Sequence, residues 1–437
     1  FDQRIMSNCK VNLLTLPKFL SINITNSLAG IQSFPGANAM NAPCYLDSPD
    51  CSLTRRRFLV MAGASLVASV GVPACSEIKR TTYEVVPERP DGLGDLAKRK
   101  GFVYGANISP ATLLRSEFAA LAEKELAGLA PTHMLDFGFQ RPMRYQPLNF
   151  FYADALATFA KARGMEFRGR PFFWWYRVPS WFEELDKAQA EREYVGFIRS
   201  VIGRYKGQAA SWEVPFESID HDGYGMRNHA YMRKFGERHL DLFYQVAREI
   251  DGTARLVYSE YHLEYADPRH ERRRWQVLRL LDRLRSRGVP IDALGIQGHL
   301  FTRSMFSESG LRYFLRQVAH MGLEIHITEL DCGDFRSPEA TRDQEVADEY
   351  FRFLSIALAE PAVVRVYSHD VTDAHSWVNH IPLPLYPRRT DGLAQRPLPF
   401  DKDFRRKPAW TALARAFDQA PVRQPRVPGD APQAARP

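Results

Sequence analysis

Cysteine is scarce in this chain, and its scarcity excludes a fold that depends on many disulfide bonds. The 437 residues contain five cysteines, and three of them lie within the first 51 residues. Only Cys75 and Cys332 remain for the rest of the chain. Small secreted domains that are held together by disulfides carry cysteine at a much higher density.

Metal-binding patterns are missing as well. The 12 histidines are scattered, and no His-x-x-x-His or Cys-x-x-Cys pair occurs with further ligands nearby. The sequence therefore predicts a protein that uses neither a metal ion nor another cofactor.

A large excess of charge of one sign is also lacking. The formal net charge is +7, and beyond the first 74 residues 52 basic residues stand against 48 acidic ones. This surplus is too small to indicate a nucleic acid or another polyanion as the partner.

No apolar run near the N-terminus has the length of a membrane-spanning helix. Residues 60–74 are apolar and small, but a span needs about 20 residues. They follow Thr-Arg-Arg-Arg-Phe-Leu at 54–59, which is the layout of a twin-arginine export signal. We therefore predict that residues 1–75 are an N-terminal extension and export signal, and that the protein is periplasmic or extracellular. A retained membrane anchor and lipid attachment at Cys75 are the alternatives to cleavage.

Short apolar runs alternate with longer amphipathic ones between residues 101 and 417. Eight strands are expected, at 102–107, 133–137, 167–174, 211–216, 255–260, 293–299, 324–330 and 363–368. Helices are expected between them, at 152–162, 192–205, 231–250, 271–287, 311–321 and 343–358. This alternation favours an α/β fold in which a single catalytic domain forms a monomeric (β/α)8 TIM barrel. A linker at 76–100 and a disordered tail at 418–437 would flank it.

Polar residues that end the strands are candidates for the active site, because barrels of this kind build their sites there. Glu217 ends the fourth predicted strand, Gln297 and His299 end the sixth, and Glu329 ends the seventh. A retaining glycoside hydrolase needs two carboxylates about 5 Å apart, one to protonate the leaving oxygen and one to attack the sugar. Two glutamates at suitable strands favour catalysis over a surface ion pair or a helix cap.

Five motifs in chain order resemble glycoside hydrolase family 10, the xylanase family, over residues 101–416. They are Arg-Gly-Arg-Pro-Phe-Phe-Trp-Trp with Pro-Ser-Trp at 168–181, Trp-Glu-Val-Pro-Phe-Glu at 212–217, Pro-Ile-Asp-Ala-Leu-Gly-Ile-Gln-Gly-His at 290–299, Ile-Thr-Glu-Leu-Asp at 327–331 and Val-Thr-Asp-Ala-His-Ser-Trp at 371–377. The resemblance implies that Glu329 is the nucleophile, that Glu217 is the acid and base, and that His299 orients Glu329 through a hydrogen bond. We expect the substrate to bind at Trp174, Trp175, Arg170, Arg177, Gln297, His262, His369 and Trp377.

The expected sugar-binding shell departs from the family's pattern. Phe216 stands where the family has asparagine, Trp175 and Arg170 stand where it has histidine, and 133–137 lacks its xylose-binding Glu-Asn and Lys. Guanidinium groups bind carboxylates well. We therefore expect a retaining hydrolase of β-glycosidic bonds that acts on an acidic or branched bacterial exopolysaccharide. A carbohydrate-binding protein and a polysaccharide-assembly protein on the same barrel, both without catalysis, are the alternatives.

Overall fold

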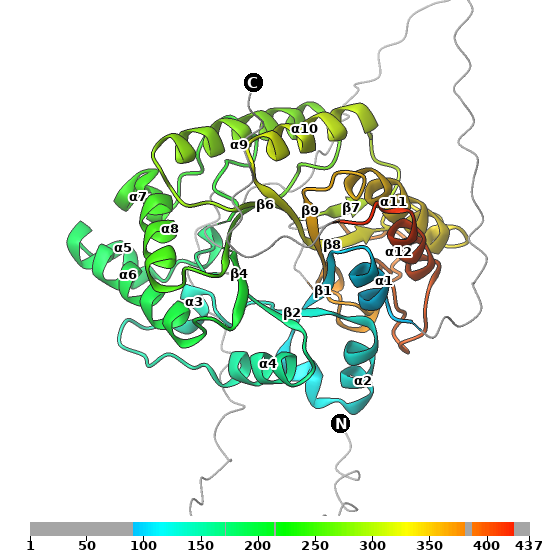
Figure 1. Cartoon of the computed structure of the whole chain (residues 1–437), viewed down its shortest axis with the longest axis horizontal. Helices are drawn as coiled ribbons and strands as arrows, with labels where there is room; N and C mark the ends of the chain where they lie inside the picture. The colour runs from blue at the N-terminus through cyan, green and yellow to red at the C-terminus, as the bar shows by residue number, and fades with distance from the viewer. Residues whose placement is uncertain (1–90, 171, 214–215, 381–386, 424–437) are drawn as a thin grey trace, which may run out of the picture. The chain divides into compact units, whose positions relative to one another are not determined.

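The structure is a computed structural model that describes residues 91–170, 172–213, 216–380 and 387–423. Its strands close into a parallel barrel (Figure 1). The barrel strands are β1 (Val103–Ile108), β2 (Gly128–Pro131), β3 (Glu166–Gly169), β4 (Ala209–Glu213), β5 (Arg255–Glu260), β6 (Ala293–Ile296), β8 (Glu324–Gly333) and β9 (Val363–His369). Pairing of β6 with β8 and of β9 with β1 closes the ring. The predicted (β/α)8 fold is confirmed.

Helices surround the strands in the expected alternation (Figure 1). They are α1 (Leu93–Arg99), α2 (Ser116–Glu125), α3 (Phe137–Gln140), α4 (Phe151–Ala162), α5 (Ser180–Glu184), α6 (Lys187–Arg204), α7 (Ala230–Phe235), α8 (Arg238–Ile250), α9 (Pro268–Ser286), α10 (Glu308–His320), α11 (Arg342–Ala357) and α12 (Pro408–Gln419). Local sequence explains where several begin. Asp186 and Gln189 form a capping box before α6, and Asp267 caps α9 ahead of Pro268. Each helix among the described residues is too short or too polar to cross a membrane.

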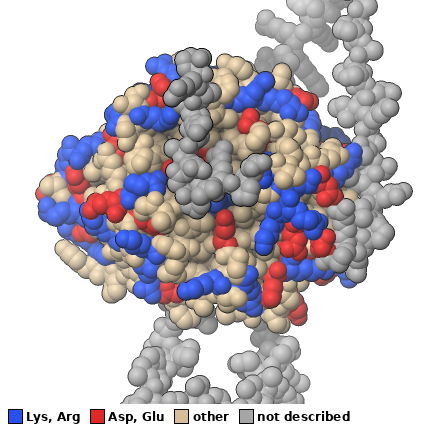
Figure 2. Space-filling model, in the orientation of Figure 1, with Lys and Arg blue, Asp and Glu red and all other residues tan. Residues whose placement is uncertain are grey.

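Charged side chains on the outer helices pair across neighbouring helices. Figure 2 shows Lys and Arg interspersed with Asp and Glu on one face of the molecule. Arg199 of α6 pairs with Glu249 of α8 at 2.9 Å, and Arg287 after α9 pairs with Asp241 of α8 at 2.7 Å. The arginine-rich segment at 269–287 therefore belongs largely to this outer layer.

The second strand lies five residues before its predicted position. The prediction placed it at 133–137, whereas β2 is Gly128–Pro131 and 133–137 leads into α3. Glycine and proline in a four-residue run are typical of a loop rather than a strand. Here Gly128 is required by packing, because a Cβ atom on it would lie 2.1 Å from the hydroxyl of Tyr367.

The folded region extends beyond both predicted ends of the domain. Helix α1 lies inside the predicted linker at 76–100, and its Leu93 is fully buried. Helix α12 runs to Gln419, and buried Arg423 donates from Nε to the carbonyl oxygen of Val363 at 2.7 Å. The rest of the predicted linker and tail, and the predicted export signal with Cys75, lie outside the described residues.

Gly169 in β3 offers a test of how tightly the barrel interior is packed. A Cβ atom at this position would lie 1.9 Å from Cζ3 of Trp212, which is fully buried. We expect Gly169→Ala to lower the free energy of unfolding by about 1–3 kcal/mol, because Trp212 must move. Gly196→Ala is the matched control, since Gly196 is exposed on α6 with no atom within 4 Å and alanine favours helix. Denaturant titration of both variants measures the difference, and unchanged stability of Gly169→Ala would contradict the packing argument.

Candidate active site

The segment after β4 places Glu217 at the carboxyl end of the barrel. Its backbone amide donates to the carbonyl oxygen of Ser259 in β5 at 2.9 Å, and its φ is +59°. A left-handed conformation is uncommon for residues other than glycine, and such strain is frequent at functional sites. The residues around Glu217 therefore hold a conformation that the isolated chain would avoid.

Three N–H donors surround the carboxylate of Glu217. Nε1 of Trp174 and Nε1 of Trp175 both donate to Oε2, at 2.9 and 2.7 Å, and Nε2 of Gln297 donates to Oε1 at 3.0 Å. Both oxygens of this carboxylate therefore lie among polar hydrogens, although Glu217 is buried. The two tryptophans and Gln297, all expected to bind substrate, direct these hydrogens to the carboxylate instead.

Arg227 also belongs to this part of the site, although no sequence signal singled it out. Its Nε donates to the carbonyl oxygen of Glu217 at 2.9 Å, and its Nη2 donates to the hydroxyl of Tyr261 at 2.7 Å. The guanidinium lies 4.2 Å from the ring centre of Trp175. Arg227 thus joins the strained turn at Glu217 to one of the indoles that bind its side chain.

Glu329 lies where the register of β8 is irregular. The pairing of β8 with β9 shifts between Ile327 and Leu330. The carbonyl oxygen of Thr328 is therefore available to accept hydrogen bonds from side chains. Nδ2 of Asn107 donates to that oxygen at 2.8 Å, and Nη1 of Arg168 approaches it at 3.5 Å. Irregular registers re-aim side chains next to active sites, and this one carries Glu329.

The carboxylate of Glu329 is buried and faces cationic and imidazole groups. Nη2 of Arg170 lies 2.5 Å from Oε1, and Nε2 of His369 lies 3.1 Å from Oε2. Burial alone would raise the pKa of Glu329. The charge of Arg170, the hydrogen bond and charge of His369 and the charge of His299 outweigh burial and hold that pKa well below its usual range. The carboxylate is therefore ionised, as a nucleophile requires.

Arg170 was expected to bind an acidic substrate, and its contacts contradict that expectation. Its Nε donates to Glu213 at 2.9 Å while its Nη2 contacts Glu329, and only 1% of its side chain is exposed. A guanidinium that is buried against two carboxylates is not open to a third group that arrives with the substrate. His369, also expected at the substrate, contacts Glu329 directly.

His299 does not make the direct hydrogen bond to Glu329 that was expected. Its Nε2 lies 3.9 Å from Oε2 of Glu329, whereas its Nδ1 lies 2.9 Å from Oδ1 of Asp331. Nε1 of Trp377 donates to the other oxygen of Asp331 at 2.6 Å. Burial would lower the pKa of His299, but the charge and hydrogen bond of Asp331, with the charge of Glu329, raise it to about 9. His299 thus acts on Glu329 as a charge at a distance.

His133 and Asp136, which follow β2, form one side of the site. They were not predicted as site residues because the second strand was placed at 133–137. The ring of His133 stacks on Trp174 with centres 6.0 Å apart and planes 2° apart. Burial, then the charges of Arg177 and Arg170, lower the pKa of His133 to about 3. Asp136 accepts from the backbone amide of Trp174 at 3.4 Å, and burial raises its pKa to about 7. With β2 placed correctly, the polar residues that follow its end would have indicated this part of the site.

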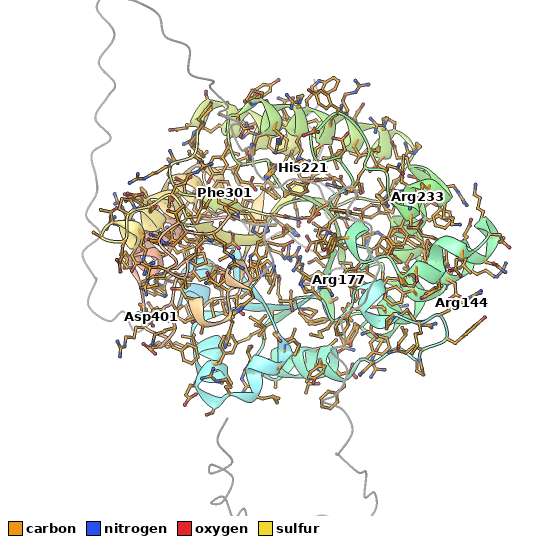
Figure 3. All side chains as sticks on the ribbon, turned by 180° about the vertical axis from the view of Figure 1, so that it is seen from behind. Arg144, Arg177, His221, Arg233, Phe301 and Asp401 are labelled. Carbon is orange, nitrogen blue, oxygen red and sulfur yellow. The ribbon has the colours of Figure 1, made fainter. Side chains whose placement is uncertain are left out.

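Arg177 and His262, the two remaining residues that were expected to bind substrate, each lie beside an aromatic ring. The guanidinium of Arg177 is 5.8 Å from the ring centre of Trp174 and has no hydrogen-bond acceptor among the described residues. Figure 3 shows Arg177 near the middle of the barrel, whereas Arg144 lies toward the rim. His262, at φ +55° after β5, packs its ring 4.6 Å from that of Tyr261. Across the described ranges, no group of three or more His, Cys, Asp or Glu side chains is arranged to hold a metal.

A closed parallel barrel with one buried glutamate just after its fourth strand and another within its seventh defines the class of barrel glycoside hydrolases. The model of glycosyl hydrolase family 10 matches residues 92–416, and the chain belongs to this family. The predicted glycoside hydrolase is thereby confirmed at the level of the family.

The chain is also similar to known relatives in sequence, and to a solved structure in fold. The chain is 29% identical over 294 residues to endo-1,4-beta-xylanase 1 of Humicola insolens, covering 67% of this chain and 65% of that enzyme. It is 28% identical to endo-1,4-beta-xylanase A of Phanerodontia chrysosporium, covering 74% of this chain and 77% of that one. The structure of xylanase 10B from Thermotoga petrophila in complex with xylobiose superposes with a TM-score of 0.69 at 23% identity, covering 76% of this chain and 99% of that one.

The pairing of His299 with Asp331 predicts a titration that can be measured directly. We expect an imidazole pKa near 9 for His299 in the wild type. In Asp331→Asn the negative charge that favours the imidazolium is lost while burial remains, so the pKa should fall toward or below 6.5. NMR titration of the ring gives both values. Asp391→Asn removes an exposed carboxylate elsewhere and should leave the His299 pKa unchanged; an unchanged pKa in Asp331→Asn would refute the pairing.

Proposed function

We propose that this chain hydrolyses β-glycosidic bonds of a polysaccharide by double displacement, with retention of configuration at the anomeric carbon. The observation that carries the proposal is the contrast between the two glutamates. Glu329 is held ionised by Arg170 and the histidines, whereas Glu217 lies among neutral indole and amide donors. Different environments for two carboxylates are the means by which one becomes a nucleophile and the other a proton donor.

The two steps use the same pair of residues. Glu217 gives a proton to the leaving oxygen while an oxygen of Glu329 bonds to the anomeric carbon. Glu217 then takes a proton from water, whose oxygen attacks that carbon and returns the electron pair to Glu329. The relatives named as endo-1,4-beta-xylanases, and the xylobiose complex of the Thermotoga petrophila enzyme, support a β-linked substrate.

Glu329→Gln and Glu217→Gln should differ in a way that identifies their roles. We expect Glu329→Gln to lose at least about 1000-fold in kcat on every glycoside, because no nucleophile remains. Glu217→Gln should lose as much on an oligosaccharide but far less in the first step on dinitrophenyl β-xylobioside, whose leaving group needs no proton. Steady-state rates on both substrates, with far-UV circular dichroism as a control for folding, test this. Near wild-type rates in either variant on the oligosaccharide would exclude these roles for the two glutamates. In the wild type, NMR of the first-formed anomer must show retention of configuration.

The substrate that we propose is an acidic or branched exopolysaccharide. Of the four arginines that follow β2 and β3, Arg144 pairs with Glu193, Arg141 binds a backbone carbonyl, and Arg170 serves two glutamates. Arg177 remains; it is half-buried and its guanidinium lies beside the ring of Trp174. A sugar carboxylate would complete its coordination. Such a substrate lies outside the cytoplasm, in line with the export signal predicted at 54–74.

Arg177→Gln should therefore discriminate between acidic and neutral substrates. We expect kcat/KM for xylo-oligosaccharides that carry a glucuronic acid branch to fall roughly tenfold to 100-fold, since a hydrogen bond to a charged group contributes about 1.5–3 kcal/mol. The value for plain xylo-oligosaccharides should be low in the wild type and hardly change. Arg144→Gln, whose arginine already pairs with Glu193, is the matched control and should alter neither. Efficient cleavage of the plain oligosaccharide by the wild type would contradict the proposed substrate.

A further inference from the structure

Two arginines at the end of β3 form a buried chain of charges with two glutamates. Arg168 and Arg170 both donate to Oε2 of Glu213, and Arg170 continues to Glu329. The side chains of all four are at most 6% exposed. Two positive and two negative charges alternate along the chain, so each ion has a counter-ion. Burial of ions is tolerated under this condition, and removal of one partner leaves an uncompensated charge.

Arg170 supplies the permanent positive charge that touches Glu329. The other arginine, Arg168, approaches β8 at the carbonyl oxygen of Thr328 and does not contact the side chain of Glu329. Histidines provide the remaining polar contacts, and their charge depends on pH. His299 is protonated up to a pKa of about 9, whereas His133 has a pKa of about 3 and is neutral under ordinary conditions.

The charged and titratable groups around Glu329 and its partners come from six elements and include both signs of charge. They are Arg168 and Arg170 from β3 and its end, Glu213 from β4, His299 from β7 (His299–Phe301), Asp331 from β8, His369 from β9 and His133 from the segment after β2. Glu213 contacts both Arg168 and Arg170, and Asp331 is balanced by His299. Arg170 is therefore the permanent cation that Glu329 shares with Glu213.

We propose that Arg170 is a positioning residue that keeps Glu329 ionised and makes it a good leaving group in the second half of the double displacement. This inference rests on the proposed function. In the first step Glu329 loses its negative charge as it bonds to the anomeric carbon, and Arg170 loses its counter-ion. In the second step water, deprotonated by Glu217, attacks that carbon and the electron pair of the breaking bond returns to Glu329. Arg170 stabilises the carboxylate that reappears, so the glycosyl-enzyme breaks down faster than it would without this cation.

Replacement of Arg170 should slow the second step. With dinitrophenyl β-xylobioside we expect a lower steady-state rate in Arg170→Gln than in the wild type, preceded by a burst of dinitrophenolate of about one equivalent per enzyme. Intact-protein mass should then show the glycosyl-enzyme. Arg170→Lys keeps the positive charge and should stay closer to the wild-type steady-state rate. Arg144→Gln is the control, because Arg144 pairs with Glu193 outside this set of buried charges, and it should leave the rate unchanged.

The pH profile gives a second readout that a merely structural role would not move. Loss of the cation raises the pKa of Glu329 toward its ordinary value, and the nucleophile must be ionised. The acid limb of kcat/KM should therefore move upward by about one pH unit or more in Arg170→Gln, and should stay in place in Arg170→Lys and in the control Arg144→Gln. If Arg170→Gln does not fold, Arg170→Gln combined with Glu213→Gln keeps the buried chain neutral and replaces it in both assays.

The outcomes separate this inference from the proposed function. A 2-fluoro analogue of the dinitrophenyl xylobioside should label Glu329 in the wild type. If it does not, and no hydrolysis occurs, the double displacement itself is wrong. If Glu329 is labelled but the Arg170 variant without the cation shows neither a burst nor a shifted acid limb, only the role of Arg170 is overturned.

Discussion

Strand β8 is the element on which the whole site depends, because it pairs with β6 and β9 and closes the barrel. All ten of its residues are buried. Its closure brings Glu329 next to groups that are distant in sequence: Arg170 is 159 residues away, and the backbone amide of Glu329 donates to the carbonyl oxygen of Gln297 at 2.8 Å. The shifted register beside Glu329 is maintained by Asn107, which takes the carbonyl oxygen that the ladder leaves free. A barrel that did not close would have no assembled site.

Closure also creates an electrostatic requirement in the barrel interior. Charges removed from water need partners, and in this protein β3, β4 and β8 each contribute to one set. Sequence changes within this set are therefore coupled. Arg170 needs both Glu213 and Glu329, because it contacts both carboxylates and is itself buried.

The barrel and the two glutamates could be predicted because local patterns carry them. The strand at 255–260 coincides with β5, and six predicted helices overlap observed ones. The second strand could not be found, since Gly128 and Pro131 resemble a loop, whereas Gly128 is required by its packing against Tyr367, which is distant in sequence. Side-chain partners were harder still. Trp174, Trp175 and Gln297 were expected to face a sugar, but the direction of an indole or amide hydrogen is set by tertiary contacts that no local pattern encodes.

The two indoles on one oxygen of Glu217 determine where its acidic hydrogen resides. A carboxylate oxygen has two lone pairs, and the N–H groups of Trp174 and Trp175 occupy both of those on Oε2. In the proposed role of proton donor, Glu217 would therefore carry its hydrogen on Oε1, where Gln297 takes only one lone pair. A leaving oxygen would receive it only from that edge of the carboxyl group. In the proposed mechanism the paired tryptophans thus fix the face of the glycosidic bond from which protonation occurs.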